Sequence, residues 1–475
     1  MTKVAVTCST YRNPENDPFI RTYGVVSLIN QMLNQNFDGE VCISLIDDSP
    51  TPHVFAQKVS DALPDQVSYV HVTDRHQLRG ILEQEAPERA MLVPTDSDLQ
   101  RASILLLRQM VEQRLPVTTG DLKLAQGNFD LNEAEWDALL GWTKPEIVSP
   151  ERAAHFLGTQ NIDALQADEN ANFWMQRLGE VRSYGSLVPF EEDYPIQTNT
   201  YKQVFEERPT IGMKKNAGNA IAAACFGKPD VLVYADDDDQ HGPDYVSRVV
   251  NALGQNDFTR MTRYFTYIFN ADPGAAQPGV FNLPIIKQQN NYWALTHEGK
   301  EQTRYMWLPE EGRFNDTTTI GEKFSRPVSL AWPILSHEGA LHTYRYATWE
   351  ESLSGIGGAF PASFCEDIIG YRALKDSLGD RFRDVLTPVE PGEESFIRIA
   401  DGNNASVIEV TGHIEVSEMP DWARDSLNFL HAAYIDPDCC TDETLGYLAG
   451  QFAHNGILSV HDVAGRPDRT ASLSM

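Results

Sequence analysis

Four consecutive aspartates, Asp236 to Asp239, are the residues of this chain most able to bind a metal ion. Carboxylates a few ångströms apart repel one another by roughly several kcal/mol at an effective dielectric constant of about 20, so a cation stabilises such a cluster. Oxygen ligands favour Mg²⁺ or Mn²⁺, especially where a substrate phosphate completes the coordination shell. A calcium-binding EF-hand loop is excluded, because a loop starting at Asp237 would place Arg248 where a bidentate Glu is required. A solvated acidic turn is the alternative interpretation.

The flanking segments predict the elements that would position these aspartates. Asp230 to Ala235 is a short apolar run with β-branched and aromatic residues, which predicts a buried strand. The following segment predicts a helix that begins near Pro243 and repeats apolar residues at helical spacing, namely Val246, Val249, Val250 and Leu253. The strand would deliver the carboxylates to the sheet edge at which α/β proteins bind ligands.

The N-terminal region predicts a nucleotide-binding α/β arrangement. There are strand-like segments at 3–9, 40–46 and 67–72. An amphipathic helix is predicted at 21–35, between the first two strands, and Asp47 and Asp48 follow the second strand. No Gly-x-Gly-x-x-Gly motif follows the first strand, so the fingerprint of a dinucleotide-binding fold is missing.

The remaining sequence suggests three regions. We expect an α/β domain formed by 1–75 and 205–395, with its nucleotide-binding half first. A mostly helical insertion is predicted at 76–204, from helical patterns at 101–113, 132–142 and 150–165. The region 396–475 is predicted to contain a hairpin, helices and a polar tail.

Composition restricts the function classes. The 475 residues include 38 basic and 68 acidic side chains, and the resulting net charge of −30 disfavours a nucleic acid partner. The sequence shows no signal peptide and no apolar run long enough for a transmembrane helix. Six cysteines without a metal-type Cys-x-x-Cys pair are consistent with reduced thiols, so we expect a cytoplasmic protein.

Several short motifs occur in an order that resembles family 2 glycosyltransferases of the GT-A fold. The matching segments are Cys8-Ser9-Thr10-Tyr11-Arg12, Ser27-Leu28-Ile29-Asn30-Gln31, Asp47-Asp48-Ser49-Pro50, Lys215-Asn216-Ala217-Gly218-Asn219-Ala220, Asp236 to Asp239 with Pro243, and Glu366-Asp367. The resemblance covers about 1–72 and 205–380, and the combination of motifs is much more specific than any single motif. It implies that the α/β domain at 1–75 and 205–395 is catalytic, with its acceptor half second.

The chain also departs from the family pattern. The interval from Asp48 to Asp236 is much longer than usual, which is why an inserted module is expected. Asp96 and Asp98 lie nearer to the usual spacing, but only Asp236 to Asp239 is accompanied by the Asn216–Gly218 motif and by Pro243. We therefore prefer the later segment as the metal site.

The resemblance implies transfer of a sugar from a nucleotide diphosphate, with a UDP-sugar favoured and Mn²⁺ or Mg²⁺ as cofactor. It implies that Asp236 and Asp238 bind the metal, with Asp238 as the first choice for a direct ligand. The residues that it implies for donor binding are Thr10, Tyr11, Arg12, Asp47, Asp48, Lys215, Asp236 and Asp237. Asp367, with Glu366 beside it, is the implied general base that deprotonates the acceptor hydroxyl, which indicates direct displacement with inversion.

Alternatives remain open at this stage. A sugar-nucleotide pyrophosphorylase or other nucleotidyltransferase can share the core architecture, but the segment 7–14 lacks the glycine-rich phosphate loop of that class. A non-catalytic sugar- or protein-binding relative is the third possibility. His337, His342 and Arg345 could contact the metal or diphosphate, although a structural role is favoured for each. The acceptor (a glycan, a lipid-linked molecule or a small molecule), the sugar and the oligomeric state do not follow from the sequence.

Overall fold

The protein consists of two compact units in the computed structural model. The first unit comprises Met1–His71, Cys225–Tyr346 and Arg383–Met475, and the second comprises Val72–Ala224 and Ala347–Phe382. The residues that the structure describes are 1–11, 20–115, 117–129, 148–187, 206–261, 263–268, 286–290, 305–308, 313–316, 342–353, 371, 374–375, 377–390, 392–400, 412–413, 419–423 and 425–426.

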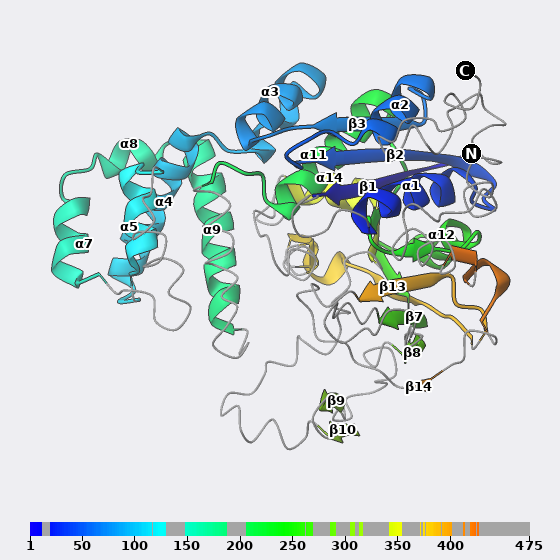
Figure 1. Ribbon diagram of the computed structural model, residues 1–475. Helices are drawn as coiled ribbons and strands as arrows, with labels where there is room; N and C mark the ends of the chain where they lie inside the picture. The colour runs from blue at the N-terminus through cyan, green and yellow to red at the C-terminus, as the bar shows by residue number, and fades with distance from the viewer. Residues whose placement is uncertain are drawn as a thin grey trace, which may run out of the picture. The chain divides into compact units, whose positions relative to one another are not determined.

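The described part of the first unit is built on a mixed sheet of seven strands. In spatial order these are β12 (Asp384–Thr387), β6 (Phe258–Met261), β11 (His342–Arg345), β4 (Val231–Ala235), β1 (Thr2–Thr10), β2 (Gly39–Asp47) and β3 (Val67–His71). Strands β4, β1, β2 and β3 run parallel, and Figure 1 shows β1, β2 and β3 beside one another. Strand β11 runs antiparallel to both of its neighbours. The predicted α/β class is therefore confirmed.

The order of the parallel strands creates a switch point beside β1. The chain runs outward from β1 through β2 to β3 and then returns to β4 on the opposite side of β1. In open α/β sheets, ligands bind outside the carboxyl ends of the strands at such a reversal. The register aligns Cys8 of β1 with Ala235 of β4, so the segments that follow these strands leave the same edge of the sheet.

One face of this sheet is covered by α1 (Ile20–Leu33), α2 (Val54–Ala62) and α12 (Tyr245–Leu253). Alternate residues along β1, namely Val4, Val6 and Cys8, are fully buried in the same apolar core as these helices. This alternation follows from the two-residue repeat of a strand, and it confirms the strand predicted at 3–9.

A second sheet in the first unit continues directly from the acidic segment. Its described strands, in spatial order, are β14 (Gly412–His413), β8 (Ile286–Asn290), β7 (Arg263–Ile268), β13 (Phe396–Ala400) and β5 (Gln240–His241). A separate antiparallel pair is formed by β9 (Tyr305–Leu308) and β10 (Arg313–Asp316). Two consecutive strands belong to different sheets, because β6 pairs with β11 in the first sheet and β7 pairs with β13 in the second.

The regular elements described in the second unit are helical. They are α3 (Arg75–Glu85), η1 (Pro87–Leu92), α4 (Asp96–Glu112), α5 (Thr119–Gln126), α7 (Pro150–Leu157), α8 (Ile162–Gln166), α9 (Glu169–Leu187), η6 (Gly379–Arg381), most of α11 (Ile211–Phe226) and most of α14 (Tyr346–Leu353). Helices α4, α5 and α9 lie side by side (Figure 1). The helix predicted at 150–165 is divided into α7 and α8, because α7 ends at Gly158.

Capping residues explain where several of these helices begin. Thr95 and Asp98 form a reciprocal capping box at the start of α4, and Thr118 and Asp121 form another at α5. The core between α4 and α9 includes Trp174, which is 1% exposed and whose indole N–H donates to the Met91 carbonyl oxygen at 3.1 Å. The second unit thus has its own helix caps and its own buried core residue, Trp174.

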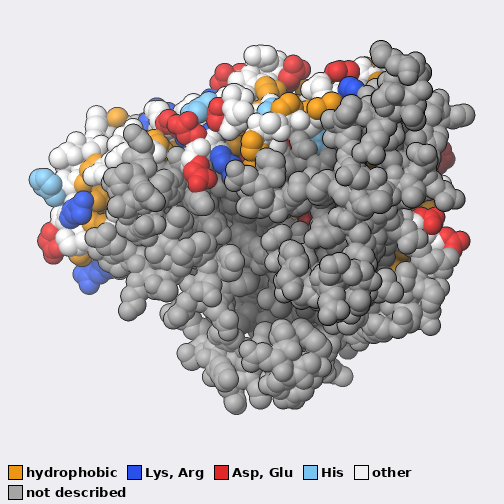
Figure 2. Space-filling model, viewed as in Figure 1, with side chains coloured by type: hydrophobic (Ala, Val, Ile, Leu, Met, Phe, Trp, Pro, Cys, Tyr) orange, Lys and Arg blue, Asp and Glu red, His pale blue; other side chains and the backbone are white. Residues whose placement is uncertain are grey.

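Opposite charges are paired on the surface of the second unit. Arg79 contacts Glu83, Arg101 contacts Asp168 and Arg108 contacts Glu112, at N–O distances of 2.9, 3.0 and 2.7 Å. Figure 2 shows both acidic and basic side chains on the described part of one face of the molecule. Among the described helices, none is both long and apolar enough to span a lipid bilayer.

Candidate functional site

The four aspartates form a turn at the carboxyl end of β4, beside the switch point. The backbone N–H of Asp239 donates to the carbonyl oxygen of Asp236 at 3.4 Å. Asp237 and Asp239 are buried, with 4% and 2% of their surface exposed, whereas Asp236 and Asp238 are partly exposed. We call Asp237 and Asp239 the inner pair of the turn, and Asp236 and Asp238 the outer pair.

The inner pair holds the turn in place. The Asp237 carboxylate accepts a hydrogen bond from the hydroxyl of Thr10, the last residue of β1. Asp239 Oδ1 accepts from the backbone N–H of Ile399 in β13 at 3.0 Å. Each buried carboxylate thus links the turn to a different strand, while Asp236 and Asp238 are the carboxylates that solvent can reach. The binding of a metal ion by Asp236 and Asp238 stays a prediction.

Helix α1 supports the turn and the strand that follows it. The side chains of Ser27 and Gln31 donate to Gln240 Oε1 at 2.7 and 2.8 Å, and the backbone N–H of His241 donates to Gln31 Oε1 at 2.7 Å. Just beyond α1, Gln35 Oε1 accepts from the backbone N–H of Val246 at 2.9 Å, which satisfies a donor in the first turn of α12. The polar residues of α1 therefore fix both ends of β5.

Gly24 lets α1 approach the aspartate turn. A Cβ atom at this position would overlap the carbonyl oxygen of Asp237. A backbone oxygen in a turn that is bonded to two strands has little room to move, so we infer that the close contact requires glycine here. Sequence reasoning missed this residue. The signal available to it was the helical spacing of Gly24, Ser27 and Gln31, a small residue followed by two polar ones.

We expect Gly24→Ala to destabilise the first unit by about 1–3 kcal/mol, because the added methyl group forces either α1 or the aspartate turn to move. Gly80→Ala is the matched control, since Gly80 also lies within a helix and a Cβ atom there would meet nothing within 4 Å. The control should be neutral or stabilised by about 0.5–1 kcal/mol through helix propensity. Urea unfolding of both variants measures the difference, and equal midpoints would contradict the inferred contact.

His241 is a buried, neutral imidazole directly behind the turn. Its side chain packs edge-to-face against Tyr245 and Phe396, with ring centroids 4.8 and 5.1 Å away. Within the described part of the chain, neither ring nitrogen has a hydrogen-bond partner. Burial lowers the pKa of His241 from 6.5 to about 3. Between these two values the unfolded chain binds a proton at this histidine and the folded chain does not, so stability falls as the pH drops through that window.

His241→Phe should remove this acid sensitivity, because phenylalanine keeps the ring contacts and cannot be protonated. The wild-type protein should lose about 2 kcal/mol more stability than the variant between pH 7 and pH 5. Denaturant unfolding at the two pH values tests this, with His155→Gln as a control at an exposed histidine of α7. An identical pH dependence in wild type and His241→Phe would refute the assignment.

The turn at the end of β2 contains a carboxylate, that of Asp47, which already accepts hydrogen bonds from neighbouring residues. Asp47 is fully buried, and its carboxylate accepts from the backbone N–H of Ser49 at 2.9 Å and from the Tyr69 hydroxyl at 2.6 Å. The Tyr69 hydroxyl oxygen in turn accepts from the backbone N–H of His53 at 2.5 Å. Asp48 is 5% exposed, and its backbone N–H donates to the Thr10 carbonyl oxygen at 3.3 Å. Thr10 therefore touches both the Asp47–Asp48 turn and the aspartate turn.

The other predicted site residues lie elsewhere or outside the description. Tyr11 is partly exposed after β1, and Lys215 is 4% exposed on α11 in the second unit. His342 is fully buried in β11, where its Nδ1 lies 3.2 Å from the Tyr344 hydroxyl. Arg345 donates to the backbone carbonyl oxygens of Asn256 and Gly254. The residues outside the described parts of the chain are Arg12, His337, Glu366 and Asp367.

The competing acidic pair, Asp96 and Asp98, begins helix α4 in the second unit. Asp98 is 4% exposed and accepts hydrogen bonds from the backbone N–H and the hydroxyl of Thr95 at 3.0 and 2.7 Å. Burial raises the pKa of Asp98, but these hydrogen bonds and the nearby Arg101 and Arg79 outweigh it and leave the pKa below its ordinary value. Asp98 thus belongs to the capping box of α4, whereas Asp236 and Asp238 are partly exposed residues after a strand.

Comparison with models of known protein families gave no match, and comparison with curated protein sequences gave none either.

Proposed function

We propose that this protein is a metal-dependent inverting glycosyltransferase of the GT-A type, which moves a sugar from a nucleotide diphosphate to an acceptor hydroxyl. The observation that carries the proposal is the junction between Thr10 and Asp237, which joins the end of β1 to the aspartate turn after β4 at the switch point. Motifs far apart in the sequence, both expected to bind the donor, are neighbours there. Ligand binding at this edge is the general property of open α/β sheets.

The donor set after β4 fits a hard divalent cation. Asp236 and Asp238 offer carboxylate oxygens only, and they are the two aspartates of the turn that are partly exposed. Such ligands suit Mg²⁺ or Mn²⁺, which keep several coordination positions for water and for substrate phosphates. A bound cation would neutralise the negative charge that develops on the leaving diphosphate. Asp237 and Asp239 are assigned the separate task of holding the turn.

The nucleoside would lie against the ends of β1 and β2. Thr10, Tyr11 and Asp48 occur together at this edge, and the sequence adds Arg12. Because the Asp47 carboxylate accepts from Ser49 and Tyr69, we assign Asp47 to shaping the turn that presents Asp48. A carboxylate at this position would accept from a pyrimidine N–H, so UDP is the favoured nucleotide.

Transfer also requires a base on the acceptor side. By resemblance this role falls to Asp367, with Glu366 beside it, and Lys215 would assist a phosphate or the ribose. A carboxylate base without an enzyme nucleophile gives direct displacement, so the sugar is transferred with inversion. The acceptor hydroxyl loses its proton to the base as its oxygen bonds to the anomeric carbon and the nucleotide diphosphate departs.

Thermal unfolding with UDP, with Mn²⁺ and with both together tests the proposal. Binding of the pair should raise the unfolding temperature more than the sum of the two separate shifts, because the cation and the diphosphate share one site. Donor hydrolysis across UDP-, GDP- and TDP-sugars then identifies the nucleotide. Release of inorganic pyrophosphate from a sugar phosphate and UTP would favour a pyrophosphorylase instead. Binding without turnover of any donor or acceptor would indicate a non-catalytic relative.

A further inference from the structure

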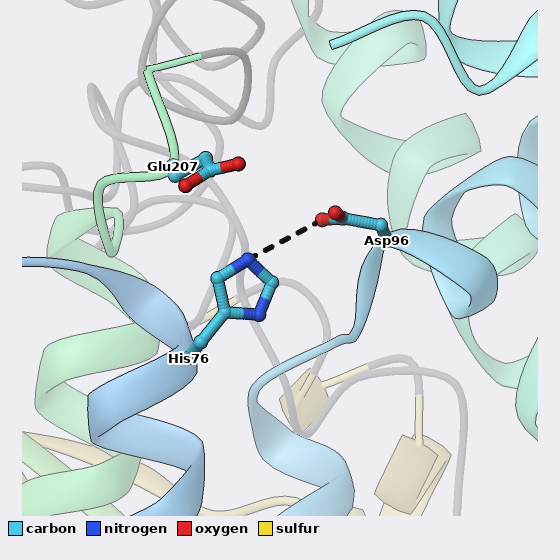
Figure 3. Close-up of side chains that lie close together, drawn as sticks. All are labelled: His76, Asp96 and Glu207. Carbon is cyan, nitrogen blue, oxygen red and sulfur yellow. Dashed lines mark ion pairs between the residues drawn. The ribbon is translucent and has the colours of Figure 1, made fainter.

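A second set of possible metal ligands lies in the second unit, formed by His76, Asp96 and Glu207. One ligand atom from each of these side chains lies within 4.8 Å of the other two. His76 is in the first turn of α3, Asp96 is the first residue of α4 and Glu207 precedes α11. Figure 3 shows the imidazole and the two carboxylates gathered around one small space. Among the described residues, no other group of three or more His, Cys, Asp or Glu side chains has this geometry.

Local hydrogen bonds position the backbone of each of these residues. The Asp74 carboxylate caps α3 by accepting from the backbone N–H of Gln77 at 2.9 Å, which fixes the turn that carries His76. The Thr95 capping box fixes the turn that carries Asp96. The carbonyl oxygen of Glu207 accepts from the backbone N–H of Arg75 at 2.7 Å, which joins the third segment to α3. The arrangement therefore does not depend on the three side chains themselves.

The charges near the cluster leave it with an excess of negative charge when His76 is neutral. The guanidinium of Arg75, which is fully buried, contacts the Asp96 carboxylate and balances one of the two acids. His76 Nε2 is 3.5 Å from Asp96 Oδ1, which is longer than a hydrogen bond to a carboxylate. His76 and Glu207 are exposed and Asp96 is partly exposed, so an ion and its water ligands could enter from solvent.

We propose that His76, Asp96 and Glu207 bind a divalent transition metal, with Zn²⁺ as the probe of choice. An imidazole beside two carboxylates suits Zn²⁺, Mn²⁺ or Fe²⁺ better than Ca²⁺ or Mg²⁺, whose preferred ligands are all oxygen. Three protein ligands would leave open positions for water. The ion would connect the starts of α3 and α4 to the segment before α11, which are far apart in the chain, and would stabilise the second unit. This site is independent of the nucleotide site proposed after β4.

Zn²⁺ titration calorimetry tests the proposal on the full chain carrying Asp236→Asn and Asp238→Asn, so that the other metal site is removed. His76→Ala and Glu207→Gln should each weaken one Zn²⁺ site by at least about tenfold, because each removes one of three ligands. His155→Ala, at an exposed histidine of the same unit, should leave the affinity unchanged. The three substitutions alter solvent-exposed side chains, and unfolding in the presence of EDTA checks that each variant remains folded.

Two results would overturn the proposal. One is the absence of any Zn²⁺ binding that saturates, and the other is the same affinity in His76→Ala and Glu207→Gln as in the parent. In either case the proximity of His76 to Asp96 is an ordinary surface contact and not part of a metal site. A Zn²⁺-dependent rise in unfolding temperature that is lost in both variants and kept in His155→Ala would support the site by a second measurement.

Discussion

Asp238→Asn should lower the affinity for UDP in the presence of Mn²⁺ by roughly 100-fold, or about 2.8 kcal/mol. Asp238 is one of the two partly exposed carboxylates of the turn, and no other role within the turn has been assigned to it. Asparagine keeps the shape of the side chain and removes the charge that holds the cation. Calorimetric titration of UDP with and without Mn²⁺ measures the effect. The metal-independent component should be unchanged.

Asp65→Asn provides the matched control, because it removes the same charge from an exposed position of the first unit. Its affinity for UDP with Mn²⁺ should equal that of the wild type. If Asp238→Asn also bound UDP with Mn²⁺ as tightly as the wild type does, Asp238 would not be a metal ligand. If both substitutions weakened binding equally, the effect would come from net charge alone.

Asp367→Asn should reduce the turnover number for transfer by roughly 10²–10⁴-fold while leaving donor binding intact. The physical reason is that an amide cannot accept the proton of the acceptor hydroxyl, whereas the nucleotide and cation are held by other residues. The measurements are steady-state transfer rates and Mn²⁺-dependent UDP affinity for the same variant. This combination separates a catalytic base from a residue that only supports the fold.

Asp380→Asn removes an exposed carboxylate of the described chain and should leave both quantities unchanged. Equal loss of binding and turnover in Asp367→Asn would place Asp367 in donor binding or folding. Full turnover in Asp367→Asn would show that Asp367 is not the general base, and Glu366 would then be the candidate.

Much of the first unit could be predicted because its local sequence and its packing agree. The strand predicted at 40–46 is β2 (Gly39–Asp47), since one run of apolar residues supplies both faces of a parallel strand. The helix predicted at 21–35 is α1 (Ile20–Leu33), since its apolar residues repeat at helical spacing and pack on the sheet. The local sequence does not show that the consecutive strands β6 and β7 pair in two different sheets, because each pairing partner is distant in the chain.

The site was predictable in its residue types and less so in its contacts. The position of the aspartates after β4 follows from the apolar run before them. The division into inner and outer carboxylates does not, because it depends on Thr10 and Ile399, which are distant in sequence. Asp47 was interpreted as a ligand for the nucleotide, yet its contacts to Ser49 and Tyr69 become visible only when β2 and β3 are paired.

The cluster of His76, Asp96 and Glu207 illustrates the same limit in the second unit. No spacing motif links these residues, because they come from the starts of two helices and from a turn before a third helix, which meet only after folding. Asp96 drew attention in the sequence as part of an Asp-Ser-Asp segment, where its neighbour Asp98 proves to be a helix cap. Short motifs report local structure reliably, whereas clusters assembled by tertiary contacts require the fold.

The most direct test of the proposed function is anomalous diffraction from crystals of the protein soaked with Mn²⁺ and UDP. The proposal predicts a manganese peak bound by the Asp238 carboxylate, with Asp236 beside it and the diphosphate oxygens completing the shell at the carboxyl ends of β1 and β4. Nucleotide bound elsewhere, or bound here with Asp236 and Asp238 facing solvent and no manganese between them and the diphosphate, would contradict it.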